Sequence, residues 1–221
     1  STHLKDGSAL RLTQQTDYPW DGKITLSLQE TPARPFSIFL RIPGWCMGAS
    51  LLVNGKRVIG INGSPAPSSA GSPATGLIPG EYTAIHRRWK TGDKIELMLP
   101  MPVVLSVANP LVEETRNQVA VRRGPIVYCL ESPDLPPGTN LFNVAMPAHP
   151  HLVAVAARIG NTRIMSLQGK AKLLPTTHWE NKLYQNLSPA PATDIPVRLV
   201  PYYAWANRGS SDMTVWMPVV Q

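Results

Sequence analysis

The side chains that could do chemistry in this chain are first of all its carboxylates. Two carboxyl groups about 5–10 Å apart can act as acid and base in the cleavage of a glycosidic bond. Glu113 and Glu114 are adjacent, so in a strand they would point to opposite faces and could not oppose each other across a substrate. Asp21 and Asp93 each neighbour a glycine at a turn, where aspartate commonly accepts backbone hydrogen bonds. Because Glu131 stands alone, the sequence predicts no catalytic residue.

Two histidines and two cysteines are the other candidates for reactive or metal-binding groups. His149 and His151 would place two imidazoles on one side of an extended chain, but no third ligand lies nearby and a Pro-flanked surface loop explains the pair better. Cys46 and Cys129 lie far apart and belong to no metal-spaced cluster. Their apolar surroundings favour two buried free thiols, and a disulfide between them stays open. We expect no metal and no cofactor in this segment.

Aromatic side chains could form platforms for sugars, because the axial C–H faces of a sugar ring are apolar. Four of the six tryptophans lie in or beside expected strands, where a core usually takes them: Trp45, Trp89, Trp205 and Trp216. The remaining candidates for carbohydrate contact are Trp20, which shares a turn with Tyr18, and Trp179.

Size and composition describe a globular chain. With 221 residues, 43% of them apolar and 16% charged, it is long enough for one large or two ordinary domains and can bury a core. Its 23 prolines and 16 glycines are too many for a helical protein and suit a fold with many turns. No run of eighteen apolar residues appears, so we expect no membrane span.

The net charge of +7 is spread along the chain in scattered pairs such as Lys56-Arg57, Arg87-Arg88 and Arg122-Arg123. No block of five like charges and no recognition motif accompanies these pairs, so we expect no nucleic-acid partner. The chain begins Ser1-Thr-His, without a methionine, and the lack of a signal peptide leaves the compartment open between cytoplasmic, periplasmic and extracellular.

Short runs of strand length, each stopped by Gly, Pro, Asn or Asp, predict the elements of the first half. The expected strands are Leu10–Gln14, Lys23–Leu28, Ser37–Ile42, Leu51–Val53, Lys56–Val58, Tyr82–Arg88 and Lys94–Leu99. Asn54-Gly55 predicts a type I′ hairpin turn, because that turn needs two residues at positive φ. Residues Gly60–Gly80 contain four prolines and predict a long exposed loop.

The second half is less regular but is also strand-rich. The expected strands are Val119–Leu130 (broken at Gly124-Pro125), Val153–Ile159, Arg163–Leu167, Lys170–Leu174, Val197–Trp205 and Thr214–Val220. A short helical turn is expected within Thr177–Leu187. The residues that we expect to be buried are Leu26, Phe39, Leu40, Ile42, Val53, Ile95, Leu97, Val127 and Trp205, although Phe39 and Leu40 cannot both face one side. The pattern is typical of an all-β fold of antiparallel β-sandwiches.

Several strings occur together and in order. They are Tyr18-Pro-Trp-Asp-Gly22, Leu40-Arg-Ile-Pro-Gly-Trp45, Val53-Asn-Gly55, Trp89 with Gly92-Asp93, Leu99-Pro-Met101, Arg123-Gly-Pro-Ile-Val-Tyr-Cys-Leu-Glu131 and Tyr202-Tyr-Ala-Trp-Ala-Asn-Arg-Gly209. This ordered set resembles the C-terminal part of glycoside hydrolase family 127, the bacterial β-L-arabinofuranosidase-like proteins first grouped as a domain of unknown function. The resemblance covers nearly the whole chain.

The resemblance implies a catalytic (α/α)6 barrel that precedes β-sandwich domains. In the family, a cysteine nucleophile in a zinc site with Cys and Glu ligands, together with a Glu acid/base, belongs to that barrel. No string here matches those motifs, so Cys46 and Cys129 are not expected to be nucleophile or zinc ligands. The expected function is a non-catalytic region that supports the barrel of the same parent chain and helps it self-associate. The alternatives are a carbohydrate-binding module with its own affinity and a structural or interaction domain unrelated to sugars.

The family layout also implies a nested arrangement of two jelly-roll-like sandwiches. The first would comprise residues 1–108 and 210–221, and the second, residues 109–209, would be inserted before the last strand of the first. Residues Leu99–Val112 are the expected apolar patch for packing on the barrel, because Pro100, Pro102 and Pro110 would keep this stretch from extending a sheet.

Overall fold

The structure is a computed structural model that describes residues 1–58, 76–175, 181–184, 186 and 191–220. The chain forms two compact units, Ser1–Pro102 and Val103–Gln221. The described residues form strands and four short 3₁₀ helices, and nearly all strand pairs are antiparallel, so the predicted all-β class is confirmed. Among the described residues no helix is long and apolar enough to cross a membrane.

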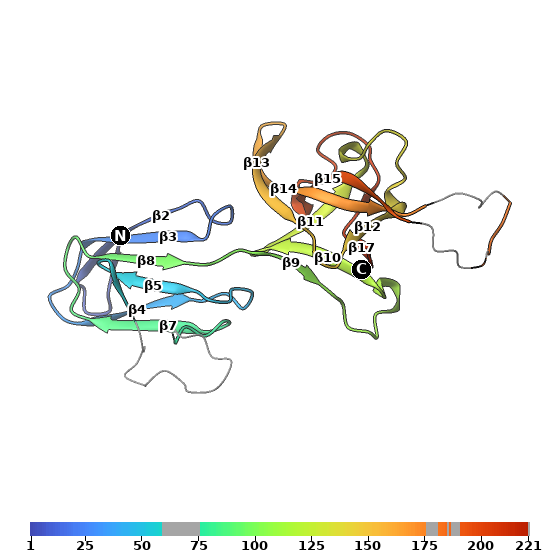
Figure 1. The fold of residues 1–221 in the computed structure, drawn as a ribbon. Coiled ribbons are helices and arrows are strands. Elements are labelled where there is room, and N and C mark those ends of the chain that lie inside the picture. The colour runs from blue at the N-terminus through green and yellow to red at the C-terminus, as the bar shows by residue number, and fades with distance from the viewer. Residues whose placement is uncertain (59–75, 176–180, 185, 187–190, 221) are drawn as a thin grey trace. The chain divides into compact units, whose positions relative to one another are not determined.

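The first unit is a sandwich of two sheets (Figure 1). The larger sheet has the order β1 (Thr2–His3), β2 (Ala9–Thr16), β3 (Lys23–Glu30), β8 (Lys94–Met98), β5 (Ser50–Val53) and β6 (Lys56–Arg57). The smaller sheet pairs β4 (Phe36–Arg41) with β7 (Tyr82–Arg87). Alternate residues of both sheets enter one core, for example Leu26 and Leu28 of β3, Ile95 of β8 and Leu40 of β4. The positive φ of Asn54 and Gly55 confirms the predicted hairpin between β5 and β6.

One residue that was predicted to be buried in this unit is exposed. Phe39 is 63% exposed, whereas Phe36 and Leu40 are buried. Phe39 is paired with Ala84 on the outer face of β4–β7, together with Arg41 and Tyr82. Alternation along a strand allows only one of two neighbouring residues to enter the core, and here the inward set contains Leu40.

The second unit contains the remaining strands. They are β9 (Val103–Ser106), β10 (Gln118–Arg123), β11 (Ile126–Glu131), β12 (Val144–Pro147), β13 (Leu152–Ile159), β14 (Thr162–Leu173), β15 (Thr193–Pro201), β16 (Met213–Thr214) and β17 (Trp216–Val220). Pairings run from β11 through β15, β14, β12, β17 and β10 back to β11, so six strands form a closed ring. Only the pair of β12 with β17 is parallel within this ring. Side chains such as Val121, Tyr128, Leu167 and Met217 are buried.

The division of the chain differs from the nested arrangement expected above. The closing strand β17 pairs with β10 and β12 of the second unit instead of returning to the first. The first unit ends at Pro102, and β9 begins at Val103. The two units therefore follow one another along the chain, and residues 210–221 belong to the second. The family resemblance implied the nested arrangement, whereas local patterns predicted the strand itself but not its partners, which lie far away in sequence.

Glu113 and Glu114 lie in the 3₁₀ helix η1 (Glu113–Thr115), so the strand geometry considered for them does not apply. Two further expectations in the second unit are wrong. Val127 is 41% exposed, because Ile126 and Tyr128 take the inward positions of β11. Trp205 is 40% exposed, because β15 ends at Pro201 and the 3₁₀ helix η4 (Tyr202–Ala204) follows it.

The stretch expected as an apolar patch also differs from its prediction. Despite the flanking prolines, residues 103–106 pair with β10 as the strand β9. The side chains left exposed are those that follow, Val107, Leu111 and Val112. The predicted helical turn within 177–187 lies mostly outside the described residues.

Candidate functional site

The turn between β2 and β3 holds Tyr18 and Trp20, two of the residues predicted to contact carbohydrate. Thr16 fixes its entry, since Oγ1 donates to the Lys23 carbonyl (2.9 Å) and accepts from the Tyr18 N–H (3.0 Å). Asp21 fixes its exit, since Oδ1 accepts from the Lys23 N–H at 2.7 Å. Tyr18 is exposed and Trp20 is half-buried. The turn is thus held in one shape by its own hydrogen bonds.

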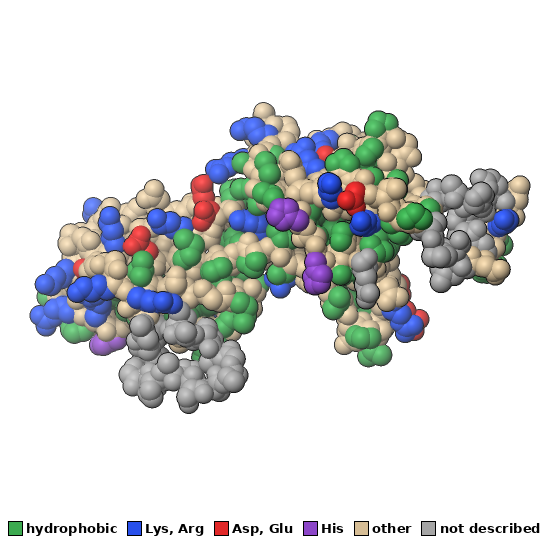
Figure 2. Space-filling view, viewed as in Figure 1, with side chains coloured by type: hydrophobic (Ala, Val, Ile, Leu, Met, Phe, Trp, Pro, Cys, Tyr) green, Lys and Arg blue, Asp and Glu red, His purple; other side chains and the backbone are tan. Residues whose placement is uncertain are grey.

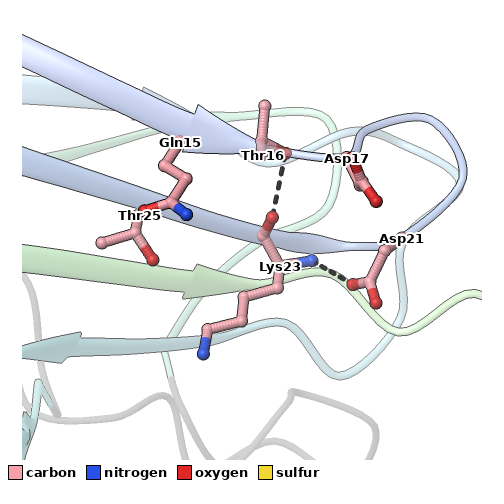
Figure 3. A pocket seen from close by; sticks show the side chains of 6 residues that line it. All are labelled: Gln15, Thr16, Asp17, Asp21, Lys23 and Thr25. Atoms are coloured by element: carbon pink, nitrogen blue, oxygen red, sulfur yellow. Dashed lines mark hydrogen bonds between the residues drawn. The ribbon is translucent and has the colours of Figure 1, made fainter.

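Beside this turn lies a polar hollow of about 370 Å³ (Figure 3). It is lined by Gln15, Thr16, Asp17, Asp21, Lys23 and Thr25. Hydroxyl, amide, carboxylate and ammonium groups offer both donors and acceptors, which suits a ligand rich in hydroxyls. Asp21 is held by the Lys23 backbone, so the arrangement fits binding better than acid–base catalysis.

Three of the ordered sequence strings meet at this end of the first unit. The Trp45 side chain hydrogen-bonds to the phenol of Tyr18, which joins the string 40–45 to the turn 18–22. The Leu99 N–H donates to the Gly22 carbonyl at 2.9 Å, and a Cβ at Gly22 would lie 1.8 Å from the Leu99 carbonyl oxygen. Only glycine fits there. The Cys46 thiol reaches the Pro100 carbonyl at 3.9 Å. These strings position the Tyr18 turn.

Burial sets the chemistry of the side chains at this end. It raises the pKa of the Tyr18 phenol, although the hydrogen bond from Trp45 acts in the opposite direction. Burial also raises the pKa of the Cys46 thiol. A thiol with a raised pKa is a poor nucleophile at neutral pH. Cys46 and Cys129 are both buried and free, and they lie in different units.

Asp93 has a structural role at the β5–β6 hairpin. Its Oδ1 accepts from the Asn54 amide at 2.8 Å, and its Oδ2 accepts from the Lys90 N–H at 2.9 Å. The Asn54 side chain in turn accepts from the Lys94 N–H at 2.8 Å. Burial acts to raise the pKa of Asp93, but the hydrogen bonds from Asn54 and Lys90 and the charge of Arg87 outweigh it, so this pKa is lowered.

Glu131 and Asp134 form the corresponding charged cluster of the second unit. Both carboxylates are bound by the guanidinium of Arg208, whose Nη1 donates to Asp134 at 2.9 Å. Glu131 also accepts from the Ala206 N–H at 3.2 Å, and Arg198 lies 3.7 Å from Asp134. The Asp134 and Glu131 hydrogen bonds raise the pKa of Arg208 and outweigh its burial. These carboxylates neutralise an arginine, so their role is structural.

The other predicted residues fall in different places. Trp179 lies outside the described residues. His149 and His151 line a hollow with residues 103–105 of β9. Within the described part of the chain, no three His, Cys, Asp or Glu side chains gather into a group that could hold a metal ion. On the face shown in Figure 2, basic side chains are spread over both units, with acidic side chains among them.

Sequence reasoning missed one exposed aromatic group. Tyr202, Tyr203 and Trp205 are all exposed, on and just after η4. The run Tyr202-Tyr-Ala-Trp directly follows Pro201, and a proline at the end of an expected strand was the signal that could have placed it beyond the sheet.

The chain matches two family descriptions along its length. Residues 1–101 match "Beta-L-arabinofuranosidase, GH127 middle domain", and residues 103–218 match "Glycoside hydrolase family 127 C-terminal domain". A non-reducing end β-L-arabinofuranosidase of Bifidobacterium longum subsp. longum is 33% identical over 218 residues, which are 95% of this chain and 30% of that protein.

Solved structures give the same result. One described as "Glycoside hydrolase" aligns with a TM-score of 0.86 and 42% identity, over 100% of this chain and 34% of its own. A GH127 β-L-arabinofuranosidase from Geobacillus stearothermophilus T6 aligns with a TM-score of 0.83 and 36% identity, over 99% of this chain and 32% of its own. The chain thus spans about a third of the length of these relatives. It belongs to glycoside hydrolase family 127 and corresponds to the middle and C-terminal domains of that family.

Proposed function

We propose that this chain is the accessory region of a β-L-arabinofuranosidase and supports a catalytic domain of the same parent protein. One observation carries the proposal: the descriptions of a GH127 middle domain and a GH127 C-terminal domain account for residues 1–101 and 103–218, while the chain covers only 30% of the Bifidobacterium enzyme. The carboxylates that sequence reasoning singled out support it further, since Asp93, Glu131 and Asp21 hold turns and an arginine.

The outer face of β4–β7 is the surface that best fits such a partner. Phe39 and Tyr82 are 63% and 66% exposed on this face, and the Arg41 guanidinium lies 5.4 Å from the centre of the Tyr82 ring. Large exposed aromatic side chains with an arginine among them are enriched in protein interfaces. A catalytic domain that covers this face would bury the aromatic area and leave Arg41 at the rim.

A chimera tests the proposal. This chain replaces the matching 30% of the Bifidobacterium enzyme, and the chimera is compared with the remaining portion alone. The chimera is expected to melt at a higher temperature and to hydrolyse an aryl β-L-arabinofuranoside, whereas this chain alone is expected to be inactive. Phe39→Ser should lower the melting temperature of the chimera but not that of the isolated chain. A remaining portion that is equally stable and active by itself would refute the supporting role.

The second candidate function is carbohydrate binding by the first unit itself. The hollow beside Tyr18 favours it, because hydrogen-bonding side chains lie next to an exposed aromatic ring. Titration of the chain with arabinose oligosaccharides is expected to perturb Trp20 fluorescence in this case, and Asp17→Ala should weaken the response. Tyr82→Ala, which alters an exposed tyrosine outside this hollow, is the matched control.

A further inference from the structure

A second hollow, in the other unit, combines an exposed aromatic ring with neutral hydrogen-bonding groups. It has a volume of about 360 Å³ and lies between the tip of the β13–β14 hairpin and η4. Its lining consists of Ile159, Gly160, Asn161, Thr162, Tyr203, Ala204 and Asn207. None of these described lining residues carries a charge at neutral pH.

One exposed aromatic ring lines this hollow, and two more exposed rings lie close to it in sequence. Tyr203 lines it and is 55% exposed, and its neighbours Tyr202 and Trp205 are 48% and 40% exposed. The rings of Tyr202 and Trp205 are stacked, with centroids 6.3 Å apart and planes inclined by 6°. Keeping three large rings in contact with water forgoes the free energy of burying them. Such groups are typical of a site that a ligand covers.

The segment 202–208, which carries the rings, is anchored by hydrogen bonds to the charged cluster of Glu131 and Asp134. The Asn207 amide nitrogen donates to the carbonyls of Ala204 (3.1 Å) and Trp205 (3.2 Å). Arg208 is bound to the buried Glu131, which also accepts from the Ala206 N–H at 3.2 Å. A segment fixed in this way loses little conformational entropy when it binds a ligand.

The hairpin tip that forms the opposite wall is fixed as well. Gly160, at positive φ, and Asn161 make a two-residue turn between the paired Ile159 and Thr162. The Arg158 guanidinium donates to the Asn161 carbonyl at 2.7 Å. The exposed side chains of Asn161 and Thr162 therefore stand at defined positions opposite the aromatic segment.

We propose that this hollow is a binding subsite for a neutral saccharide. The Tyr203 ring stacks on the apolar face of a sugar ring, and the side chains of Asn161, Thr162 and Asn207 hydrogen-bond to its hydroxyls. An anionic sugar is disfavoured, because its carboxylate would lose bound water on entering the hollow and the lining residues offer no cation to pair with it. The ligand is a free monosaccharide or the end residue of a neutral glycan, which share this chemistry. The subsite does not depend on attachment of the chain to a catalytic domain.

Titration of the 221-residue chain tests the proposal. L-Arabinose, D-galactose and a neutral arabinose disaccharide serve as probes, with D-galacturonate as the charged comparison, and binding is measured by calorimetry and by NMR. We expect the neutral sugars to bind with Kd values on the order of millimolar, as suits one small, open subsite. Tyr203→Ala and Asn161→Ala should each weaken binding about tenfold, the scale of one lost stacking or hydrogen-bonding group. Tighter binding of the disaccharide indicates the end of a glycan as the ligand.

Two control variants and the second test variant keep the experiment decisive. Tyr203→Phe keeps the ring face and should retain most of the affinity. Tyr184→Ala removes a tyrosine that is 88% exposed and lies outside the lining, and it should change nothing. Asn161→Ala changes an exposed turn residue, so it reports on the site even where Tyr203→Ala fails to fold.

The proposal is overturned by the absence of binding of every neutral sugar, by binding that survives both Tyr203→Ala and Asn161→Ala, or by tighter binding of D-galacturonate. It is also overturned if Tyr203→Ala leaves sugar binding intact and instead destabilises the chimera described above, since the rings would then contact protein. If the chimera does not gain activity, the supporting role is refuted, but the proposal of a saccharide subsite is unaffected.

Discussion

The guanidinium of Arg208 binds the buried carboxylate of Glu131, although the two residues lie 77 positions apart. Glu131 ends the string 123–131, and Arg208 lies in the string 202–209. Asp93 and Asn54 make the corresponding link in the first unit, at 2.8 Å across 39 positions. The polar residues in these strings therefore join distant parts of each unit.

Removing Arg208 should strongly destabilise the second unit. Arg208→Met leaves Glu131 buried without its counter-charge, and breaking a buried ion pair in this way costs about 3–5 kcal/mol. Urea unfolding followed by circular dichroism should show this loss. Arg11→Ala is the matched control, because Arg11 lies 3.6 Å from Glu30 on the surface and exposed pairs contribute only about 0–1 kcal/mol. A loss below about 1 kcal/mol in Arg208→Met would show that Glu131 finds another partner.

The lowered pKa of Asp93 predicts an acid-sensitive first unit. The folded-state pKa lies below the ordinary value of 3.8, so the stabilisation is complete above that pH and is lost as the pH falls through the folded value. Asp93→Asn should cost about 1–3 kcal/mol at pH 7, because charge-assisted hydrogen bonds are lost. The same variant should flatten the dependence of stability on pH below about 4. Asp194→Asn, at an exposed carboxylate beside Lys172, is the comparison and should have a small effect at pH 7. If the stability of Asp93→Asn and of the parent chain depended on pH in the same way, Asp93 would not be the source of the acid sensitivity.

Local sequence patterns predicted the positions of the strands better than they predicted which face of a strand is buried and where a strand ends. Alternation and turn residues located the hairpin at Asn54-Gly55 and placed Leu26 and Ile95 in the core. The same alternation does not say which face is inward, so Phe39 was misplaced. Nor does it reveal where a strand ends in a 3₁₀ helix, which put Trp205 in a core that it does not enter.

The candidate site shows a similar division. The pairing of Tyr18 with Trp20 in one turn followed from sequence, whereas the contact of Tyr18 with Trp45 depends on how the two sheets stack. The hollow lined by Tyr203 joins a hairpin tip to a segment that begins 41 positions after Thr162, and no local pattern predicts that contact. Likewise, the pairing of β17 within the second unit is a contact between distant strands.

Gly22 should tolerate no side chain. A Cβ there would lie 1.8 Å from the Leu99 carbonyl oxygen, a backbone atom that can move only with its strand. Gly22→Ala is therefore expected to lower stability by at least about 3 kcal/mol, at the upper end of overpacking effects. Gly48→Ala is the matched control, since no atom lies within 4 Å and only its positive φ opposes the change, at about 1–2 kcal/mol. Thermal unfolding of the two variants should separate them by several degrees, and equal melting temperatures would contradict the predicted clash.

We also expect the chain to self-associate. In the structure the exposed apolar side chains that could mediate this lie after β9, not within it. Val104 is partly buried and pairs with Arg122, whereas Leu111 is 87% exposed and neighbours the exposed Val112. Leu111→Glu should reduce concentration-dependent association in sedimentation experiments. It should not change the melting temperature, because the exposed Leu111 side chain makes few contacts within the folded chain. Val104→Glu should instead destabilise the second unit, since it brings a carboxylate into the β9–β10 pair. A chain that sediments as a monomer at every concentration, or equal effects of the two substitutions on stability, would show that this segment carries no self-association surface.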